Sequence, residues 1–259
     1  MPDRSLASEL LSRADGTDPN LAPVRSVAGI AQYDGAYALV RRYVRPGAAV
    51  LDWGSGSGHF SLFLARAGFR LTGYSYEPYS FEEWLSGTGY RFEPGGPDPV
   101  KLPFDDASFD AVVSIGVLEH VREGRGSEVG SMNEFRRVLK PGGTFICTHF
   151  PNRRSLVEAA VKALGGRYSH QFTYDRRDIV RLCRDSGFQL RHVRRYGILP
   201  RNSMSRLPGA LRRSHAFAAA YSLADAVAST LLNPFCQNYE FVAVTEAQPR
   251  AGAPPTAPS

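Results

Sequence analysis

The chain has 259 residues, 43% of them hydrophobic, which is enough for one α/β domain with additions and excludes a chain that is disordered overall. Its net charge of +6 comes mainly from dispersed arginine pairs such as Arg41–Arg42, and no basic run with interleaved aromatics indicates a nucleic-acid partner. The three cysteines are far apart and form no CxxC pair, which argues against a disulfide framework and a structural zinc site. We therefore expect a soluble, cytoplasmic protein without a metal site.

Both ends of the chain are predicted to be loosely ordered. Residues 1–25 are mixed and polar, with turn residues at Asp15–Gly16 and Asp18–Pro19, and indicate a flexible N-terminal arm with at most one short helix. Residues 248–259 are rich in proline and alanine and are predicted to be a disordered tail. No apolar segment follows a basic start, so we expect no signal peptide. Residues 26–247 are expected to form the domain.

The first predicted elements form a βαβ unit. A helix is expected after Asp34, a typical N-cap residue, and the segment 45–47 (Arg-Pro-Gly) ends it. A buried strand is predicted over 48–51, followed by Asp52 and a turn with three glycines. The following helix ends at Gly68, and a second strand is predicted over 69–74.

The alternation of strands and helices continues to residue 245. Further strands are predicted over 109–115, 144–148, 189–196 and 239–245, with helices between them, which indicates a mostly parallel sheet covered by helices on both faces. The connection 199–237 is long, contains four arginines and then an apolar helix over 216–232, and is predicted to be a helical lid over an acceptor site. A sharper hypothesis is peripheral contact of this segment with a membrane, which would admit a lipid-linked acceptor.

The glycine turn is the predicted ligand site. Gly54, Gly56 and Gly58 allow a tight turn and a close approach to a ligand at the carboxyl end of the first strand. The spacing is G-x-G-x-G, and His59 stands where the dinucleotide fingerprint has its third glycine. Asp52 would repel a pyrophosphate but would accept hydrogen bonds from an ammonium group. These residues favour a cofactor that carries an amino acid over a dinucleotide.

Four segments in order resemble class I S-adenosylmethionine-dependent methyltransferases: 50–58 (VLDWGSGSG), 101–110 (KLPFDDASFD), 117–121 (VLEHV) and 138–143 (VLKPGG). The resemblance runs from about residue 32 to residue 246. It implies a doubly wound α/β fold with a mostly parallel, seven-stranded sheet whose last strand is antiparallel. It also implies S-adenosyl-L-methionine as the cofactor and methyl transfer as the reaction.

The resemblance implies roles for residues around the cofactor. Asp52 and the three glycines would hold its methionine part, while Asp98 would bind the adenine amino group or, alternatively, serve only as a turn aspartate. Such enzymes usually bind the ribose with an acid at the end of strand two, where this chain has Ser75. We favour Glu77, two residues further, for the ribose contact, with Ser75 as the alternative.

Further residues would surround the methyl group. Ile115 and Gly116 would line the cofactor, and Tyr33 would cover it or, alternatively, pack at the start of a helix. His120 and His149 are the candidate catalytic bases for a hydroxyl acceptor. Both histidines have a structural alternative, and an acceptor that is already nucleophilic needs no base.

The expected acceptor is a small molecule, sugar, quinone or lipid-linked molecule, methylated at oxygen. Two other readings stay open. A non-catalytic, cofactor-binding partner subunit is compatible with Ser75 in place of the ribose acid, and a nicotinamide-dependent oxidoreductase is compatible with a glycine turn but is opposed by His59. A nucleic-acid methyltransferase is not favoured, because no Asn-Pro-Pro-Tyr type tetrapeptide follows the fourth strand.

Overall fold

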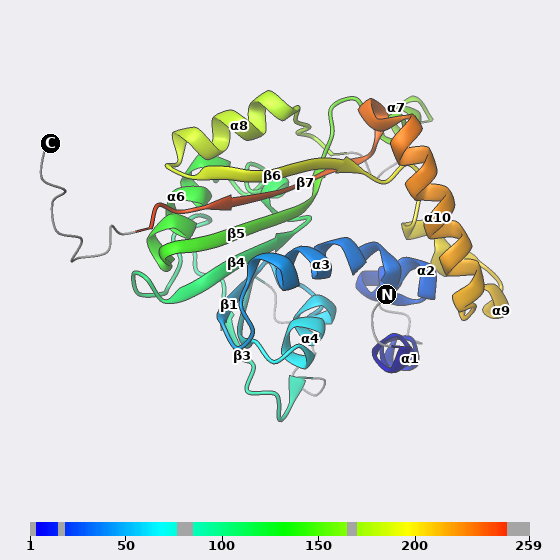
Figure 1. The fold of residues 1–259 in the computed structure, drawn as a ribbon, viewed down its shortest axis with the longest axis horizontal. Helices are drawn as coiled ribbons and strands as arrows, with labels where there is room; N and C mark the ends of the chain where they lie inside the picture. The colour runs from blue at the N-terminus through cyan, green and yellow to red at the C-terminus, as the bar shows by residue number, and fades with distance from the viewer. Residues whose placement is uncertain (1–3, 15–18, 77–84, 165–169, 248–259) are drawn as a thin grey trace, which may run out of the picture.

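A computed structural model describes residues 4–14, 19–76, 85–164 and 170–247 of the chain. Seven strands form one sheet in the order β3-β2-β1-β4-β5-β7-β6 (Figure 1). Strand β7 is antiparallel to both of its neighbours, and the other adjacent pairs are parallel. The predicted seven-stranded, mostly parallel sheet with an antiparallel last strand is thus confirmed. The strands are β1 (Ala49–Trp53), β2 (Arg70–Ser75), β3 (Arg91–Pro94), β4 (Phe109–Ile115), β5 (Leu139–Pro151), β6 (Gln189–Tyr196) and β7 (Asn238–Val244).

Helices cover both faces of the sheet (Figure 1). Alternate residues of a strand point to opposite faces, so Val50 packs in one core cluster and its neighbour Leu51 in the other. The first face carries α1 (Arg4–Arg13), α3 (Asp34–Tyr43) and α4 (His59–Arg66), and the second carries α6 (Glu128–Val138) and α8 (Arg176–Asp185). The sheet is therefore buried on both sides, which explains why consecutive residues such as Ala111, Val112 and Val113 of β4 are apolar and buried.

The N-terminal segment is more ordered than the sequence predicted. Instead of a flexible arm over 1–25, its described part forms α1 and a 3-10 helix, η1 (Pro19–Val24). Leu6, Ala7 and Leu10 are buried in the first core cluster, because their spacing places them on one face of α1. The predicted disordered tail, 248–259, lies outside the described residues.

Several element boundaries also differ from the prediction. Strand β3 and helix α7 (Leu156–Ala163) had no clear pattern: β3 is a four-residue edge strand, and α7 buries none of its residues. Strand β5 begins before residue 144, since its start pairs with β4 through a shift in register. Asp34 is the first residue of α3 and not its N-cap, a position that Tyr33 occupies.

The connection between β6 and β7 is helical, as predicted. It contains η4 (Asn202–Arg206), α9 (Gly209–Arg212), α10 (His215–Leu231) and η5 (Asn233–Phe235). Helix α10 lies beside α2 (Val27–Ile30) at one end of the sheet, where Ala218 packs on Val27 and Ala28 (Figure 1). Within the described ranges, no helix combines the length and hydropathy needed to cross a bilayer.

Candidate functional site

The turn after β1 has a backbone that requires glycine. Gly54, Gly56 and Gly58 have φ angles of 80°, 47° and 69°, in the left-handed region that other residues rarely adopt. A Cβ atom on Gly54 would lie 2.4 Å from the Val117 side chain. The amide nitrogens of Gly54 and Ser55 donate to the Tyr74 carbonyl, at 2.8 and 3.1 Å, and tie the turn to β2. The turn lies where the strand order reverses between β1 and β4, the usual ligand position in such sheets.

Asp52 is a buried carboxylate beneath this turn. Only 2% of the residue is exposed, and its Oδ2 accepts a hydrogen bond of 2.6 Å from Ser61 Oγ. Burial raises the pKa of Asp52 to about 6, against the effect of that hydrogen bond. The Ser55 hydroxyl is also buried, without a hydrogen-bond partner among the described residues. A desolvated carboxylate and an unpaired hydroxyl beside open glycine backbone fit a ligand that carries an ammonium group.

The residues predicted for the ribose and the adenine give a mixed result. Ser75 ends β2 and is half-buried, while Glu77 lies outside the described residues. Asp98 is exposed, and its Oδ1 accepts hydrogen bonds from the amides of Val100 and Lys101, at 2.8 and 3.1 Å. These two bonds lower the pKa of Asp98. Asp98 therefore has the turn role considered as its alternative, and its adenine contact stays a prediction.

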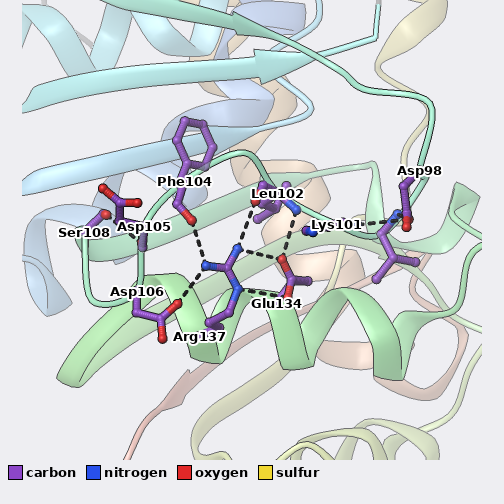
Figure 2. A network of polar contacts seen from close by, with 10 residues as sticks. Asp98, Lys101, Leu102, Phe104, Asp105, Asp106, Ser108, Glu134 and Arg137 are labelled. Carbon is purple, nitrogen blue, oxygen red and sulfur yellow. Dashed lines mark hydrogen bonds and ion pairs between the residues drawn. The ribbon is translucent and has the colours of Figure 1, made fainter.

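Arg137 on α6 anchors the segment that leads from Asp98 to β4 (Figure 2). Its guanidinium donates to the carbonyls of Leu102 and Phe104, at 2.9 and 2.7 Å, and to the carboxylates of Asp106 and Glu134. Glu134 in turn accepts the Leu102 amide at 2.9 Å. The hydrogen bonds and negative charges of Glu134 and Asp106 raise the pKa of Arg137, and Glu134 is the main cause. These contacts of Arg137 and Glu134 hold residues 98–108, which form neither a strand nor a helix, against the core.

We expect Arg137→Ala to lower the free energy of unfolding by about 2 kcal/mol, because it leaves two backbone carbonyls and Glu134 without their charged donor. Arg137→Lys should recover only part of this loss, since an ammonium group does not reproduce the planar fork of the guanidinium. Urea denaturation of the three proteins measures the difference. Arg184→Ala, which removes an exposed ion pair with Asp185, is the matched control and should change stability little.

A cavity of about 680 Å³ opens at the carboxyl ends of β4 and β5. Five of the predicted site residues line it: Tyr33, Ile115, Gly116, His120 and His149. Asp52, the three turn glycines, Ser75 and Asp98 are not among its lining residues. Val117, which follows Gly116 and packs against Gly54, connects the cavity wall to the glycine turn. The predicted residues thus divide into one group around the glycine turn and a second group that lines the cavity.

His149 has an unusual backbone. Its φ angle is 59°, and the pairing of β5 with β7 shifts register between Cys147 and Phe150. A bulge of this kind redirects a side chain, and left-handed backbone at a residue other than glycine often marks a functional position. Burial lowers the pKa of His149 to about 4, so its imidazole is neutral at pH 7. Its amide donates to the Tyr196 hydroxyl at 2.8 Å, and its ring lies 5.6 Å from that of Tyr33.

Glu119 and His170 belong to this site but had no predicted role. Glu119 is 2% exposed, and burial raises its pKa to about 8. Its Oε1 lies 3.8 Å from Nε2 of His120 and 4.0 Å from Nε2 of His170. Glu119 could have been found as the acidic neighbour of His120 in the VLEHV segment. No sequence signal indicated His170, because its place depends on how a distant loop packs.

Asp225, on α10, attaches this helix to residues 198–201, which follow β6. Its Oδ1 accepts the amides of Ile198 and Leu199, both at 2.8 Å, and its Oδ2 accepts from Arg201 at 3.0 Å. Arg201 also donates to the Ala28 carbonyl of α2 at 3.3 Å. The signal in the sequence was a single carboxylate within an apolar helix. Its role is to anchor α10 to the chain that leaves β6.

Comparison with known proteins gives partial sequence matches and a match of the whole fold. Residues 51–147 match a family model described as a methyltransferase domain. The chain is 31% identical to a demethylmenaquinone methyltransferase of Tropheryma whipplei over 120 residues, which are 44% of this chain and 46% of that protein. It is 37% identical to a sterol 24-C-methyltransferase of Gibberella zeae over 111 residues, 39% of this chain and 27% of that protein. The chain thus spans half or less of the length of these curated relatives.

One solved structure shows the extent of the fold match. The 1,6-didemethyltoxoflavin-N1-methyltransferase of Burkholderia thailandensis, with bound S-adenosylhomocysteine, superimposes with a TM-score of 0.56. The superposition covers 93% of this chain and 87% of that one, at 18% identity. At this identity the similarity concerns the fold, and it includes the segments before and after the family match.

Proposed function

We propose that this chain, whose residues 51–147 match a methyltransferase domain, is a class I S-adenosylmethionine-dependent methyltransferase that transfers a methyl group to an oxygen atom of a small-molecule or lipid-linked acceptor. The observation that carries the proposal is the cavity beside Gly116, at the carboxyl ends of β4 and β5. It adjoins the glycine turn on one side and the α10 segment on the other, so a cofactor and an acceptor would meet there.

The residues around the turn fit this cofactor. The Asp52 carboxylate would accept hydrogen bonds from its ammonium group, and the glycine backbone would pack against its methionine part. Ile115 and Gly116 would line it, and Tyr33, 7% exposed, would separate it from solvent. When bound, S-adenosylmethionine supplies a methyl group on a sulfonium, which activates it for in-line displacement. The protein therefore has mainly to orient the acceptor and exclude water.

The cavity offers neutral and cationic groups for that orientation. His149 is a neutral and weak base, so we assign it to hydrogen bonding with the acceptor and not to early removal of a proton. Arg195 donates to Tyr239 Oη at 2.8 Å and to Asn233 at 3.4 Å, and it forms no ion pair with a described carboxylate. Its guanidinium would suit an anionic substituent of the acceptor. We also propose a cytoplasmic setting, which suits the three buried, free cysteines.

A labelling experiment tests the function. The purified protein is incubated with methyl-labelled S-adenosylmethionine and an extract of its source cells, and the products are partitioned between organic solvent and water. We expect label in a product with the wild type and a loss of at least tenfold with Asp52→Ala. Label in the organic phase identifies a lipid or quinone acceptor, and label in water a sugar or other polar acceptor. Cofactor binding without label in either phase would contradict the proposal and support a non-catalytic subunit.

The exposed face of α10 supports a second part of the proposal, peripheral contact with a membrane. Leu223, Val227 and Leu231 are 68%, 52% and 76% exposed, and their four-residue spacing places them on one side of the helix. Arg206 and Arg212 precede this helix. An exposed apolar stripe on a helix that follows a basic segment is compatible with a helix that lies on an anionic lipid surface.

We expect the wild type to sediment with vesicles that contain anionic phospholipid at low salt, and a Leu223→Gln/Val227→Gln/Leu231→Gln variant to bind them at least about tenfold more weakly, since each large apolar side chain contributes about 1.5–3 kcal/mol when buried. The control is Val129→Gln/Val180→Gln, which changes exposed valines on α6 and α8. Wild-type protein that stays in the supernatant at low salt, or equal binding of both variants, would contradict the membrane contact.

A further inference from the structure

A cluster of one glutamate and two histidines lies on the wall of the cavity. Glu119 and His120 belong to η3 (Leu118–His120), directly after β4, and His170 lies in the segment before α8. Each of the three offers a ligand atom, and these atoms lie within 4.8 Å of one another. All three side chains line the same cavity as Gly116.

Each histidine has a carboxylate on the far side of its ring, and the one beside His170 is hydrogen-bonded to it. His170 Nδ1 lies 2.5 Å from Glu158 Oε1, and His120 Nδ1 lies 3.1 Å from Glu123 Oε1. The hydrogen bond to Glu158 favours the His170 tautomer in which Nε2 has a free electron pair, whereas Glu123 lies at ion-pair distance from His120. Both Nε2 atoms face the same oxygen, Glu119 Oε1, at 3.8 and 4.0 Å. Carboxylate–histidine pairs of this kind are the usual outer partners of metal-bound histidines.

The carboxylate at the centre of the cluster, that of Glu119, has one oxygen that is not hydrogen-bonded within the described part of the chain. Glu119 is buried, and its Oε2 has no hydrogen-bond partner among the described residues. Buried carboxyl oxygens are costly unless they are hydrogen-bonded, paired or bound to a metal. This orphaned oxygen points to a ligand independently of the distances within the cluster.

The loop that carries His170 is held in place by other contacts. Tyr174 donates its hydroxyl to the buried Glu128 of α6, and its ring stacks on Phe150 at 4.0 Å. The Tyr174 amide donates to the Pro151 carbonyl at 2.9 Å, and the His170 amide donates to Glu158 at 3.2 Å. The third residue of the cluster is therefore anchored to the end of β5 and to α7.

We propose that Glu119, His120 and His170 bind a divalent first-row transition-metal ion. Two imidazoles and one carboxylate form a ligand set typical of zinc, iron and related ions. Bonds of about 2.0–2.2 Å in a tetrahedral site place the ligand atoms roughly 3.3–3.6 Å apart, so small side-chain rotations suffice to close the site. Three protein ligands leave at least one coordination position open toward the cavity.

The position of the ion defines a class of acceptor, an inference that rests on the proposed methyl transfer. Glu119 Oε1 lies 3.8 Å from where a Cβ on Gly116 would be, and Gly116 is one of the residues proposed to line the cofactor. An ion there would bind an acceptor that has a hydroxyl next to a second oxygen, as in a catechol or a hydroxyquinone. Coordination would lower the pKa of the hydroxyl, whose proton passes to water. The oxygen then uses an electron pair to bond the methyl carbon, and the pair of the broken C–S bond stays on sulfur.

The metal site is tested without cofactor or acceptor. Co²⁺ and Zn²⁺ are titrated into the metal-free, full-length protein by calorimetry, and Co²⁺ binding is followed by its visible absorption. We expect one ion per chain, with affinity lowered at least tenfold by Glu119→Gln and by His170→Ala, and lowered less by Glu158→Gln. His215→Ala, which removes a histidine outside the cluster, should bind like the wild type. Equal binding by the wild type and by His120→Ala/His170→Ala would overturn the site.

Two further readouts separate this inference from the proposed function. S-adenosylmethionine affinity, measured by the fluorescence of the two tryptophans, should be the same in the wild type, Glu119→Gln and His170→Ala, which would show that the variants are folded. Methyl transfer should fall at least tenfold in both variants and in chelator-treated wild type, and should return when Zn²⁺ or Co²⁺ is added to the wild type. Methyl transfer that persists without metal would overturn the metal's role in binding the acceptor while leaving the methyltransferase function intact.

Discussion

Replacing Asp52 with asparagine is expected to stabilise the ligand-free protein at pH 7 and to weaken S-adenosylmethionine binding at least tenfold. The amide has nearly the shape of the carboxylate and can still accept the 2.6 Å hydrogen bond from Ser61. It removes a negative charge that the ligand-free protein keeps buried, and with it the predicted partner of the cofactor's ammonium group. The same substitution should therefore act in opposite directions on stability and on binding.

The pH dependence follows from the raised pKa of Asp52. Burial raises this pKa from 3.8 to about 6, so the folded protein prefers the protonated form. The stability contributed by this preference is complete below the unfolded value of 3.8 and is lost as pH rises through about 6. The shift corresponds to about 2–3 kcal/mol at pH 7. Cofactor affinity should change the other way and increase between pH 5 and pH 7, since the ionised carboxylate binds the ammonium group.

Thermal unfolding at pH 4 and pH 7, and cofactor titration at pH 5 and pH 7, measure these effects. Asp110→Asn is the matched control, because that carboxylate accepts the Ala49 amide at 2.8 Å and pairs with Arg45 and Lys140, both at 3.1 Å. Against the effect of its burial, these partners lower the pKa of Asp110, so its contribution to stability is present at pH 7 and is lost in acid. Asp110→Asn should lower stability at pH 7. An Asp52→Asn protein that is also less stable at pH 7 would contradict the argument.

Asp225→Ala is expected to lower the free energy of unfolding by about 3 kcal/mol, the lower end of the cost of breaking a buried ion pair. The change leaves the amides of Ile198 and Leu199 without their acceptor and removes the carboxylate that pairs with Arg201, whose side chain is only 14% exposed. Asp225→Asn should cost less, because its amide oxygen can still accept both backbone bonds. Loss of this anchor should loosen α10 before the sheet unfolds.

Urea denaturation and amide hydrogen exchange measure the two consequences. We expect faster exchange along α10 in Asp225→Ala, with little change in the central strands. A double-mutant cycle with Arg201→Met isolates the coupling of the pair. Thr230→Ala, on an exposed part of the same helix, is the control. Unchanged exchange in α10 would show that other contacts anchor the helix and would contradict the role of Asp225.

The sequence by itself determined the features that depend on neighbouring residues. Three glycines at alternate positions predicted the turn, because only a residue without a Cβ readily adopts positive φ at each of them. A short apolar run over 48–51 predicted strand β1, because a parallel sheet buries both faces of a strand. The family resemblance rested on these local segments, and so did the assignment of the cofactor.

Only the tertiary structure decided which distant residues share the cavity. His170 meets Glu119 because Tyr174 attaches its loop to α6 and β5. The apolar side of α1 belongs to the core because it packs with the other helices of the first face, which its own sequence does not indicate. The short edge strand β3 was identified only by its pairing with β2. Asp225 shows the same limit: its sequence context marks it as unusual, but its three hydrogen bonds come from a segment more than twenty residues earlier. Local patterns specify backbone conformation, whereas a site made of side chains from separate elements depends on long-range packing.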